Sequence, residues 1–423
     1  MIFTRRKYWY NHHVFDVSLV QSEKKLPEPS NFKRHVAFGG LFVKKSVWKI
    51  AAPAVALVFI AFFVCVRRPF TVTVTLFYDE RDLAGAVVSK QALQSVVLAM
   101  EFFNSRSSEY RFLPFRETDQ NIYESIEHAA SMGSIAIVGG INAPFASLLA
   151  DSSRRNGIPF LSLASGTSLA RADDFVFRAR PRSGGKELGL AAKHLGVSSY
   201  SVIVSGFAAS HVQEFIRDFE SELGAPPRRT MVFSGNLNKH IDDFERIAKG
   251  VDAILLVLPD WLAAVALREL RLRLPGLPVF ASNWAISHRT HLLAGSLGEG
   301  VLTVSFTPPE WDDQEHEFLR FVRDAYASPI PPVILAMGYD TVAMLDEAVR
   351  RAGSSDRRAI ADALSELTGV HTTGGTIPVD ENGDLQHSGA VFSLRSGRWV
   401  RVPDDPDALR RAIASSRPPR EEL

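Results

Sequence analysis

From Thr71 onward the chain alternates between short apolar runs and longer stretches in which apolar residues recur every three or four positions. Short continuous apolar runs bounded by turn residues are typical of strands that are buried on both faces of a parallel sheet. The runs with this pattern are Thr71–Phe77, Ile135–Val138, Phe160–Leu163, Val202–Val204, Ile254–Leu258 and Val301–Phe306.

The stretches between these runs have the period of amphipathic helices, and in 91–104 the residues Ala92, Val96 and Met100 fall on one face. The predicted helices are Ser89–Phe103, Ile122–Met132, Ala143–Arg155, Gly185–Leu195, Val212–Leu223 and Trp261–Arg273. Strands that alternate with helices indicate βαβ units and doubly wound parallel sheets. Because about ten strands exceed the usual size of one sheet, we expect two α/β lobes.

The last part of the chain has a different pattern. The segment Gly374–Gly383 predicts a strand and a turn, and the short runs Ala390–Leu394 and Trp399–Val402 follow it. The acidic spacing that starts at Asp380 is similar to a calcium loop, but Leu385 stands where that loop requires glycine. The sequence therefore predicts a hairpin here and no metal site.

One segment near the N-terminus is long and apolar enough to cross a membrane. The seventeen residues Ile50–Val66 carry no charge, and Arg67 follows them directly. A spanning helix needs about 20 apolar residues, whereas the apolar core of a signal peptide has about 7–15. The length favours an uncleaved signal anchor over 47–68; a cleaved signal peptide and a lipid anchor on Cys65 remain alternatives.

The net charge of +1 hides an uneven distribution. Residues 1–49 contain ten Lys and Arg against three Asp and Glu, which gives +7, so residues 50–423 sum to −6. An excess of Lys and Arg on one side of a span places that side in the cytoplasm. We therefore expect a basic cytoplasmic arm over 1–46, a single-pass membrane anchor, and an extracytoplasmic module. The overall balance offers no support for a nucleic-acid partner.

Motifs for catalysis and cofactor binding are absent from the sequence. It contains neither of the glycine-rich loops that bind nucleotides, GxGxxG and GxxxxGK[ST], and no GxSxG nucleophile elbow. His288 and His291 have no third metal ligand nearby in the sequence. The only cysteine, Cys65, lies in the apolar segment and leaves the outer module without a disulfide. We therefore expect no cofactor, no metal and no enzymatic activity.

Several loops resemble those of a known family. The segments 135–143 and 156–159 carry IAIVGGINA and NGIP, and SLASGTSL at 162–169 is followed by FRARP at 177–181. Later come AGSLGEGV at 294–301, AMGYDTV at 336–342 and GGTIPVDENG at 374–383. In this order and spacing they resemble the type I periplasmic binding proteins of the leucine/isoleucine/valine-binding kind, the receptor subunits of branched-chain amino-acid ABC transporters.

The resemblance covers about 71–402 and implies two doubly wound parallel-sheet lobes joined by three crossing strands, here preceded by one transmembrane helix. It places the crossings near Pro181–Lys186, Thr307–Pro309 and Gly369–Gly375. The boundaries it implies are 71–183 plus 308–371 for lobe 1, 184–307 plus 372–402 for lobe 2, and 403–423 for a C-terminal tail.

The resemblance also implies where a ligand binds. Loops after the third and fourth strands would hold an amino-acid carboxylate, and loops of the second lobe would hold its ammonium group and side chain. The residues at these positions are Ile141, Asn142, Ala143, Ala164, Ser165 and Thr167 in lobe 1, and Ser210, Asp260, Asn283 and Trp284 in lobe 2. Alternatives stay open: Asp260 as a helix cap, Ser165 and Thr167 as turn residues, and Trp284 as packing beneath a loop.

The sequence thus predicts a membrane-anchored solute-binding protein that captures a small polar ligand, with an amino acid as one candidate, by lobe closure and delivers it to an ABC permease. Two alternatives share the fold. One is a ligand sensor or interaction protein that reports through the span to a membrane partner. The other is a decoy that has lost binding, because the family's usual serine and its Tyr-Gly pair are replaced by Ala143 and the segment 207–211.

Overall fold

The computed structural model describes residues 69–78, 83–118, 121–141, 143–164, 174–179, 183–206, 209–307, 316–325, 330, 332–403 and 405–414. The predicted arm at 1–46 and the apolar segment Ile50–Val66 lie outside these ranges. Within the described residues, no helix has both the length and the apolar character needed to cross a membrane. Residues Arg67–Leu423 form one compact unit.

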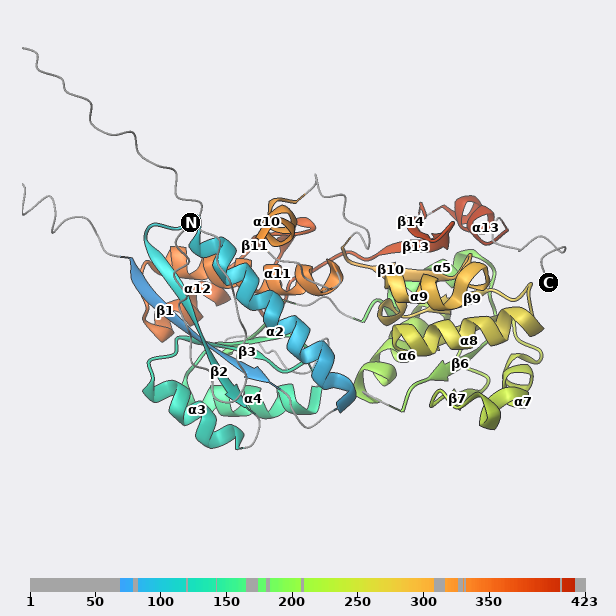
Figure 1. The fold of residues 1–423 in the computed structure, drawn as a ribbon, viewed down its shortest axis with the longest axis horizontal. Helices are drawn as coiled ribbons and strands as arrows, with labels where there is room; N and C mark the ends of the chain where they lie inside the picture. Colours follow the sequence, from blue (N-terminus) through green and yellow to red (C-terminus); the bar gives the residue numbers. More distant parts are fainter. Residues whose placement is uncertain are drawn as a thin grey trace, which may run out of the picture. The chain divides into compact units, whose positions relative to one another are not determined.

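The first lobe contains a five-stranded parallel sheet of order β2-β1-β3-β4-β5 (Figure 1). Its strands are β1 (Phe70–Tyr78), β2 (Tyr110–Thr118), β3 (Ala136–Gly139), β4 (Phe160–Ser162) and β5 (Val176–Arg178). Its helices are α2 (Leu83–Asn104), α3 (Ile122–Ser131), α4 (Ala143–Asn156), α10 (Glu317–Ala325), α11 (Pro332–Ala352) and α12 (Arg357–Ser365).

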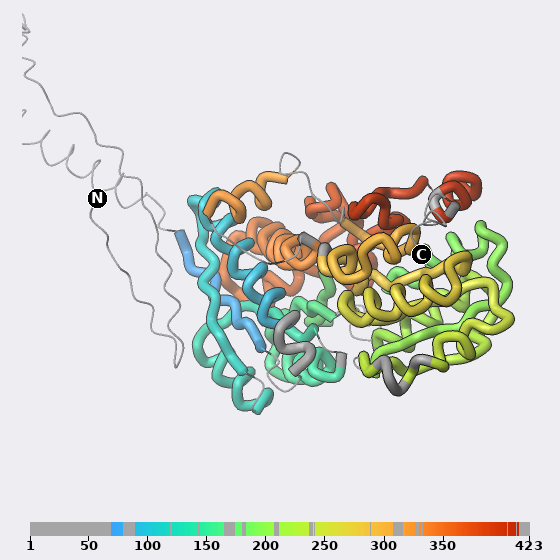
Figure 2. Tube along the Cα trace, turned by 45° about the vertical axis from the view of Figure 1, so that its right-hand side comes forward, coloured from blue at the N-terminus to red at the C-terminus, as the bar shows by residue number. Residues whose placement is uncertain are grey.

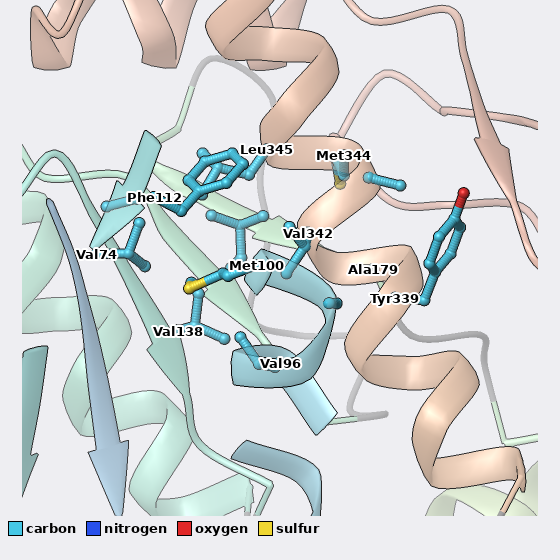
Figure 3. Packing of buried hydrophobic residues seen from close by; sticks show 14 of the residues in the cluster. Val74, Val96, Met100, Phe112, Val138, Ala179, Tyr339, Val342, Met344 and Leu345 are labelled. Atoms are coloured by element: carbon cyan, nitrogen blue, oxygen red, sulfur yellow. The ribbon is translucent and has the colours of Figure 1, made fainter. Parts of the chain in front are cut away.

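Helices cover both faces of this sheet because its central strands are apolar on both sides. Val138 of β3 packs with α2 and α11, and its neighbour Ile137 packs with α3 and α4 on the opposite face. Figure 3 shows the first of these cores, in which Met100 of α2 lies among Val74, Val138 and Val342. The alternation of the two faces follows from the two-residue period of a strand.

The second lobe contains a seven-stranded sheet of order β14-β13-β10-β9-β8-β6-β7, in which only β13 is reversed and pairs antiparallel with β10 and β14. Its strands are β6 (Tyr200–Val204), β7 (Thr230–Val232), β8 (Ala253–Val257), β9 (Val279–Ala281), β10 (Leu302–Ser305), β13 (Ala390–Arg395) and β14 (Arg398–Arg401). Its helices are α5 (Gly185–His194), α6 (Ala209–Leu223), α7 (Leu237–Ala248), α8 (Asp260–Arg273), α9 (His288–Ala294), α13 (Pro406–Ala414) and the short 3₁₀ helices η1 (Asn283–Ala285) and η2 (Gly295–Gly298).

The predicted fold class of two α/β lobes with parallel sheets is confirmed, and the chain passes between the lobes more than once (Figure 2). Strand β5 leads to α5, β10 leads to α10, and the hairpin β11 (Gly369–Thr372) and β12 (Gly375–Pro378) precedes β13. Val370 and Leu385 are buried in the core of the first lobe. The lobe boundaries stay predictions, and this packing favours a third crossing between Leu385 and Ala390, later than 369–375.

Candidate functional site

Both lobes have the same strand order around their first strand. In lobe 1 the order is β2-β1-β3-β4-β5, and in lobe 2 the part β7-β6-β8-β9-β10 repeats it. The chain direction away from the first strand reverses between β1 and β3, and between β6 and β8. In open α/β sheets ligands bind beyond the carboxyl ends of the strands at such a switch point, so the loops after these strands form the candidate site.

In lobe 2 the predicted residues follow three neighbouring parallel strands. Ser210 lies in the first turn of α6 after β6, Asp260 begins α8 after β8, and Asn283 and Trp284 form η1 after β9. The carboxyl ends of adjacent parallel strands lie at one edge of the sheet. The structure therefore brings these loops together along a single edge.

An aromatic pair joins the outer two of these loops. The imidazole of His211 stacks on the indole of Trp284 with ring centroids 4.1 Å apart and an interplanar angle of 17°. His211 is buried, whereas Trp284 keeps part of its surface exposed. Trp284 is among the predicted site residues and His211 is not, although His211 stands in the first turn after the first strand of this lobe.

Asp260 is held by residues of its own lobe. Its Oδ2 accepts a hydrogen bond of 2.8 Å from the Ser287 hydroxyl, and its Oδ1 accepts one of 2.8 Å from the Trp261 amide. The guanidinium Nε of Arg289 lies 3.9 Å from Oδ2. The residue before it, Pro259, occupies the cap position of α8. The Asp260 carboxylate therefore pairs with the guanidinium of Arg289 and holds the loop that contains Ser287 in place.

Two polar atoms after β9 are buried without a hydrogen-bond partner among the described residues. They are the side-chain oxygens of Ser282 and Asn283. A buried polar atom of this kind costs stability, and native structures keep few of them. Both atoms lie at the strand end where a ligand is expected. The side-chain oxygen of Asn283 can therefore accept a hydrogen bond from a ligand there.

In lobe 1 the structure describes only part of the predicted site. Ile141 is half-buried and packs against the core. Ala164 is fully buried, and its amide donates to the Ser162 hydroxyl at 3.1 Å, so that amide is used within the loop. The predicted Asn142, Ser165 and Thr167 lie outside the described residues, and the side chains of Ala143 and Ser210 are not described.

A second buried polar group lies where the chain passes between the lobes. Asp340 of α11 accepts hydrogen bonds from the amide and the hydroxyl of Thr373, at 2.8 and 3.3 Å. The Nε2 atom of His387 lies 3.8 Å from its Oδ2. Burial raises the pKa of Asp340 to about 7 and lowers the pKa of His387 to about 4. Burial thus favours the neutral form of both groups.

Comparison with known proteins identifies the family. A model of the periplasmic binding protein family matches residues 128–398, which is more than half of the chain. Among curated proteins no match is found. Among solved structures the fold is similar to that of the leucine-binding protein LivK from Thermotoga maritima MSB8, with 21% identity, a TM-score of 0.62, and coverage of 78% of this chain and 97% of that one.

Two further solved structures carry ligands. The branched-chain amino acid binding protein LivJ from Streptococcus pneumoniae, in complex with isoleucine, is 14% identical with a TM-score of 0.64, over 78% of this chain and 99% of that one. A solute-binding protein of an ABC transporter from R. palustris, in complex with benzoate, is 16% identical with a TM-score of 0.64, over 78% and 95%. At these identities the likeness concerns the fold. Together with the family match it confirms the resemblance seen in the sequence: the chain belongs to the periplasmic binding protein family, a family of non-enzymatic substrate-binding proteins.

Proposed function

We propose that the protein is a membrane-anchored extracytoplasmic solute-binding protein that captures a small carboxylate-bearing solute for an ABC permease. The observation that carries the proposal is the repeated strand order, because it gives each lobe one switch point at which loops can contact a ligand. Relatives of this fold bind isoleucine and benzoate. The two have a carboxylate in common.

In the proposed complex the lobe 1 loops after β3 and β4 hold the carboxylate. They contain Ile141–Ala143 and Ala164–Thr167, and α4 begins at Ala143. Backbone N–H groups at the start of a helix favour anions. Lobe 2 contributes Ser210, Asn283 and Trp284 to the rest of the ligand, while Asp260 orders the loop beside them. Closure of the lobes on the solute is a shift toward the closed state, limited by the ligand's preference for that state.

A sensor of the same fold is the second candidate. The predicted anchor and the basic arm, with +7 over residues 1–49, would tie the binding module to the membrane. In this second candidate the signal passes to a membrane partner. Co-purification in detergent with a permease supports transport, and co-purification with a receptor protein supports sensing.

Solute binding is tested by thermal unfolding of the full chain in detergent with amino acids and aromatic acids. A ligand at one hundred times its Kd raises the free energy of unfolding by about 2.7 kcal/mol, which increases the melting temperature. Asn142→Ala should remove this increase without unfolding the protein. Asn121→Ala is the matched control: its side chain caps α3, so this variant should melt earlier and keep the increase. If no solute raises the melting temperature, the proposal fails.

A further inference from the structure

The loops at the carboxyl ends of the lobe 2 strands differ from a site for an α-amino acid, because their described residues lack a free anionic acceptor for the ammonium group. An ammonium group needs an acceptor whose negative charge is available to it. The carboxylate at the expected position, Asp260, already accepts hydrogen bonds on both oxygens, and Arg289 lies within ion-pair distance. These partners belong to the same lobe, and Ser287 also caps α9 by accepting from the Thr290 amide at 3.3 Å. Each carboxylate oxygen can accept a second hydrogen bond, so the main obstacle to a ligand ammonium is the charge of Arg289 beside Asp260.

The local charge balance points the same way. The Asp260 side chain is 20% exposed, and the Arg289 side chain is 64% exposed. Asp260 also begins a helix, where the positive end of the helix dipole offsets part of its negative charge. The region around Asp260 therefore offers little net negative charge to a cationic group.

The same edge offers flat aromatic surface instead. The stacked His211 and Trp284 come from the ends of β6 and β9, and Trp261 follows β8 between them with 39% of its surface exposed. The contact with His211 fixes the plane of the Trp284 indole, and part of Trp284 stays exposed. An aromatic ring that stacks on a fixed indole gains about 0.5–1.5 kcal/mol beyond the burial of apolar area. An aliphatic side chain lacks this gain.

We propose that the solute is an aromatic carboxylate without an α-ammonium group, whose ring stacks against Trp284 while Arg289 keeps Asp260 neutralised. This inference rests on the proposed function, because it names the solute class for that site. It assigns Trp284 and Arg289 as residues that determine specificity. His211 is a positioning residue, since it holds the indole plane.

The test compares two pairs of acids, and the acids of the first pair differ only in the α-amino group. Isothermal titration calorimetry of the full chain in detergent is carried out with 3-phenylpropanoate and L-phenylalanine, and with benzoate and L-leucine as a second pair. We expect each ammonium-free aromatic acid to bind at least tenfold more tightly than the amino acid of its pair. Tighter binding of L-phenylalanine and L-leucine would overturn the solute class and leave the proposed function intact. No binding of any of the four acids would overturn the solute class, and the proposed function fails as well if no other amino acid or aromatic acid raises the melting temperature.

Variants test the two specificity residues separately. Trp284→Leu should weaken benzoate binding about tenfold, and Trp284→Phe should restore most of the affinity, because phenylalanine keeps an aromatic face. Arg289→Gln should narrow the preference for 3-phenylpropanoate over L-phenylalanine about two- to fivefold, since an exposed ion pair contributes up to about 1 kcal/mol. Equal affinities for the Leu and Phe variants, or an unchanged preference in Arg289→Gln, would contradict the assigned roles.

Discussion

A buried ion pair fastens the segment after the β11–β12 hairpin to the edge of the first sheet. The guanidinium of Arg178 in β5 donates to both carboxylate oxygens of Asp384, with Nε to Oδ1 at 3.1 Å. Only 2% of the Arg178 side chain and 6% of the Asp384 side chain are exposed. Because both charges are removed from water, each depends on the other.

Removing one member of this ion pair should lower the free energy of unfolding strongly, whereas replacing both members with apolar residues should not. Arg178→Met leaves Asp384 buried without its cation, so we expect a loss of about 3–5 kcal/mol in the free energy of unfolding. The double variant Arg178→Met with Asp384→Leu should recover most of that loss, since a packed apolar pair does not need charge compensation. Urea unfolding followed by circular dichroism measures both. A double variant as unstable as the sum of the two single variants would contradict the coupling.

The Asp340 carboxyl should make stability depend on pH. Burial raises its pKa to about 7, above the value of 3.8 that it has in the unfolded chain. The folded state therefore binds more protons between about pH 4 and pH 7, and the contribution of Asp340 to stability falls as the pH rises through this range. Asp340→Asn removes this titration, so the variant should gain stability relative to the parent from pH 4 to pH 8.

The neighbouring imidazole acts in the opposite direction. Burial lowers the pKa of His387 to about 4, so the unfolded state binds more protons up to about pH 6.5, and the contribution of His387 rises over that range. His387→Gln should therefore lose the rise between pH 4 and pH 6.5. Urea unfolding at each pH measures both variants. Curves parallel to the parent in both would show that neither group titrates with a shifted pKa.

The predicted lobe 2 residues lie after strand ends, but the sequence did not predict their contacts. Asp260 follows the apolar run at 254–258, and the family resemblance placed Asn283 and Trp284 after the next strand; strand ends are where an α/β sheet binds ligands. The partners that determine what Asp260 can do, Ser287 and Arg289, lie in the next loop along the sheet edge. No local pattern encodes such a contact, because it depends on how neighbouring loops fold against each other.

At the scale of elements, two segments that connect the lobes pack against the same strand, β10. A Cβ atom placed on Gly184, before α5, would lie 2.5 Å from Val304 of β10, and one placed on Gly389, before β13, would lie 2.7 Å from the same side chain. The ring of Phe306 lies within 3.3 Å of both positions. Val304 is thus held between two glycines that have no room for a side chain.

Alanine at Gly184 should destabilise the protein more than alanine at the other end of the same helix. Gly184 and Gly196 flank α5 and both have positive φ, at 82° and 79°. The strain of this backbone region costs a residue with a side chain about 1–2 kcal/mol. Gly196 has open space around it, so Gly196→Ala should show that cost alone.

Gly184→Ala should add a clash with Val304, and overpacking of this kind costs about 1–3 kcal/mol more. Urea unfolding measures the difference between the two variants. Equal losses of stability would mean that the space around Val304 adjusts freely, and the proposed tight packing between the passages would then be wrong.

Strands that form continuous apolar runs were predictable from the sequence, whereas edge strands and very short strands were harder to predict. The apolar runs at 135–138 and 254–258 correspond to β3 and β8, whose residues are buried on both faces. Strand β2 was not selected, because it lies at the edge of its sheet, alternates buried and exposed residues, and contains Pro114. Strands β5, β7 and β9 have three residues each and were not predicted, whereas β4, of the same length, lies within the predicted run Phe160–Leu163.

At the scale of the whole molecule, the charge distribution divides the chain. Residues 1–49, before the apolar segment, carry +7, and residues 50–423 carry −6. A positive arm next to an apolar segment orients a membrane protein with that arm in the cytoplasm. A binding module on the other side would meet solutes outside the cytoplasm, as periplasmic binding proteins do.

The apolar segment itself can be tested by introducing charge. Phe59 and Phe62 lie near the middle of Ile50–Val66, and an aspartate at the centre of a spanning helix costs about 2.5–3.5 kcal/mol. The parent and the control variant Phe59→Leu with Phe62→Leu should stay in the membrane fraction after alkaline extraction. Phe59→Asp with Phe62→Asp should leave that fraction.

The orientation of the chain in the membrane and the cleavage of its N-terminal segment can be measured separately. Alkaline phosphatase fused after Leu423 is active only outside the cytoplasm, so it should be active in the parent and in the leucine variant and inactive in the aspartate variant. An uncleaved anchor predicts that the N-terminal arm and the binding module stay on one polypeptide. A soluble, active product that lacks residues 1–66 would instead establish a cleaved signal peptide, and retention of the aspartate variant in the membrane would place the anchor elsewhere in the chain.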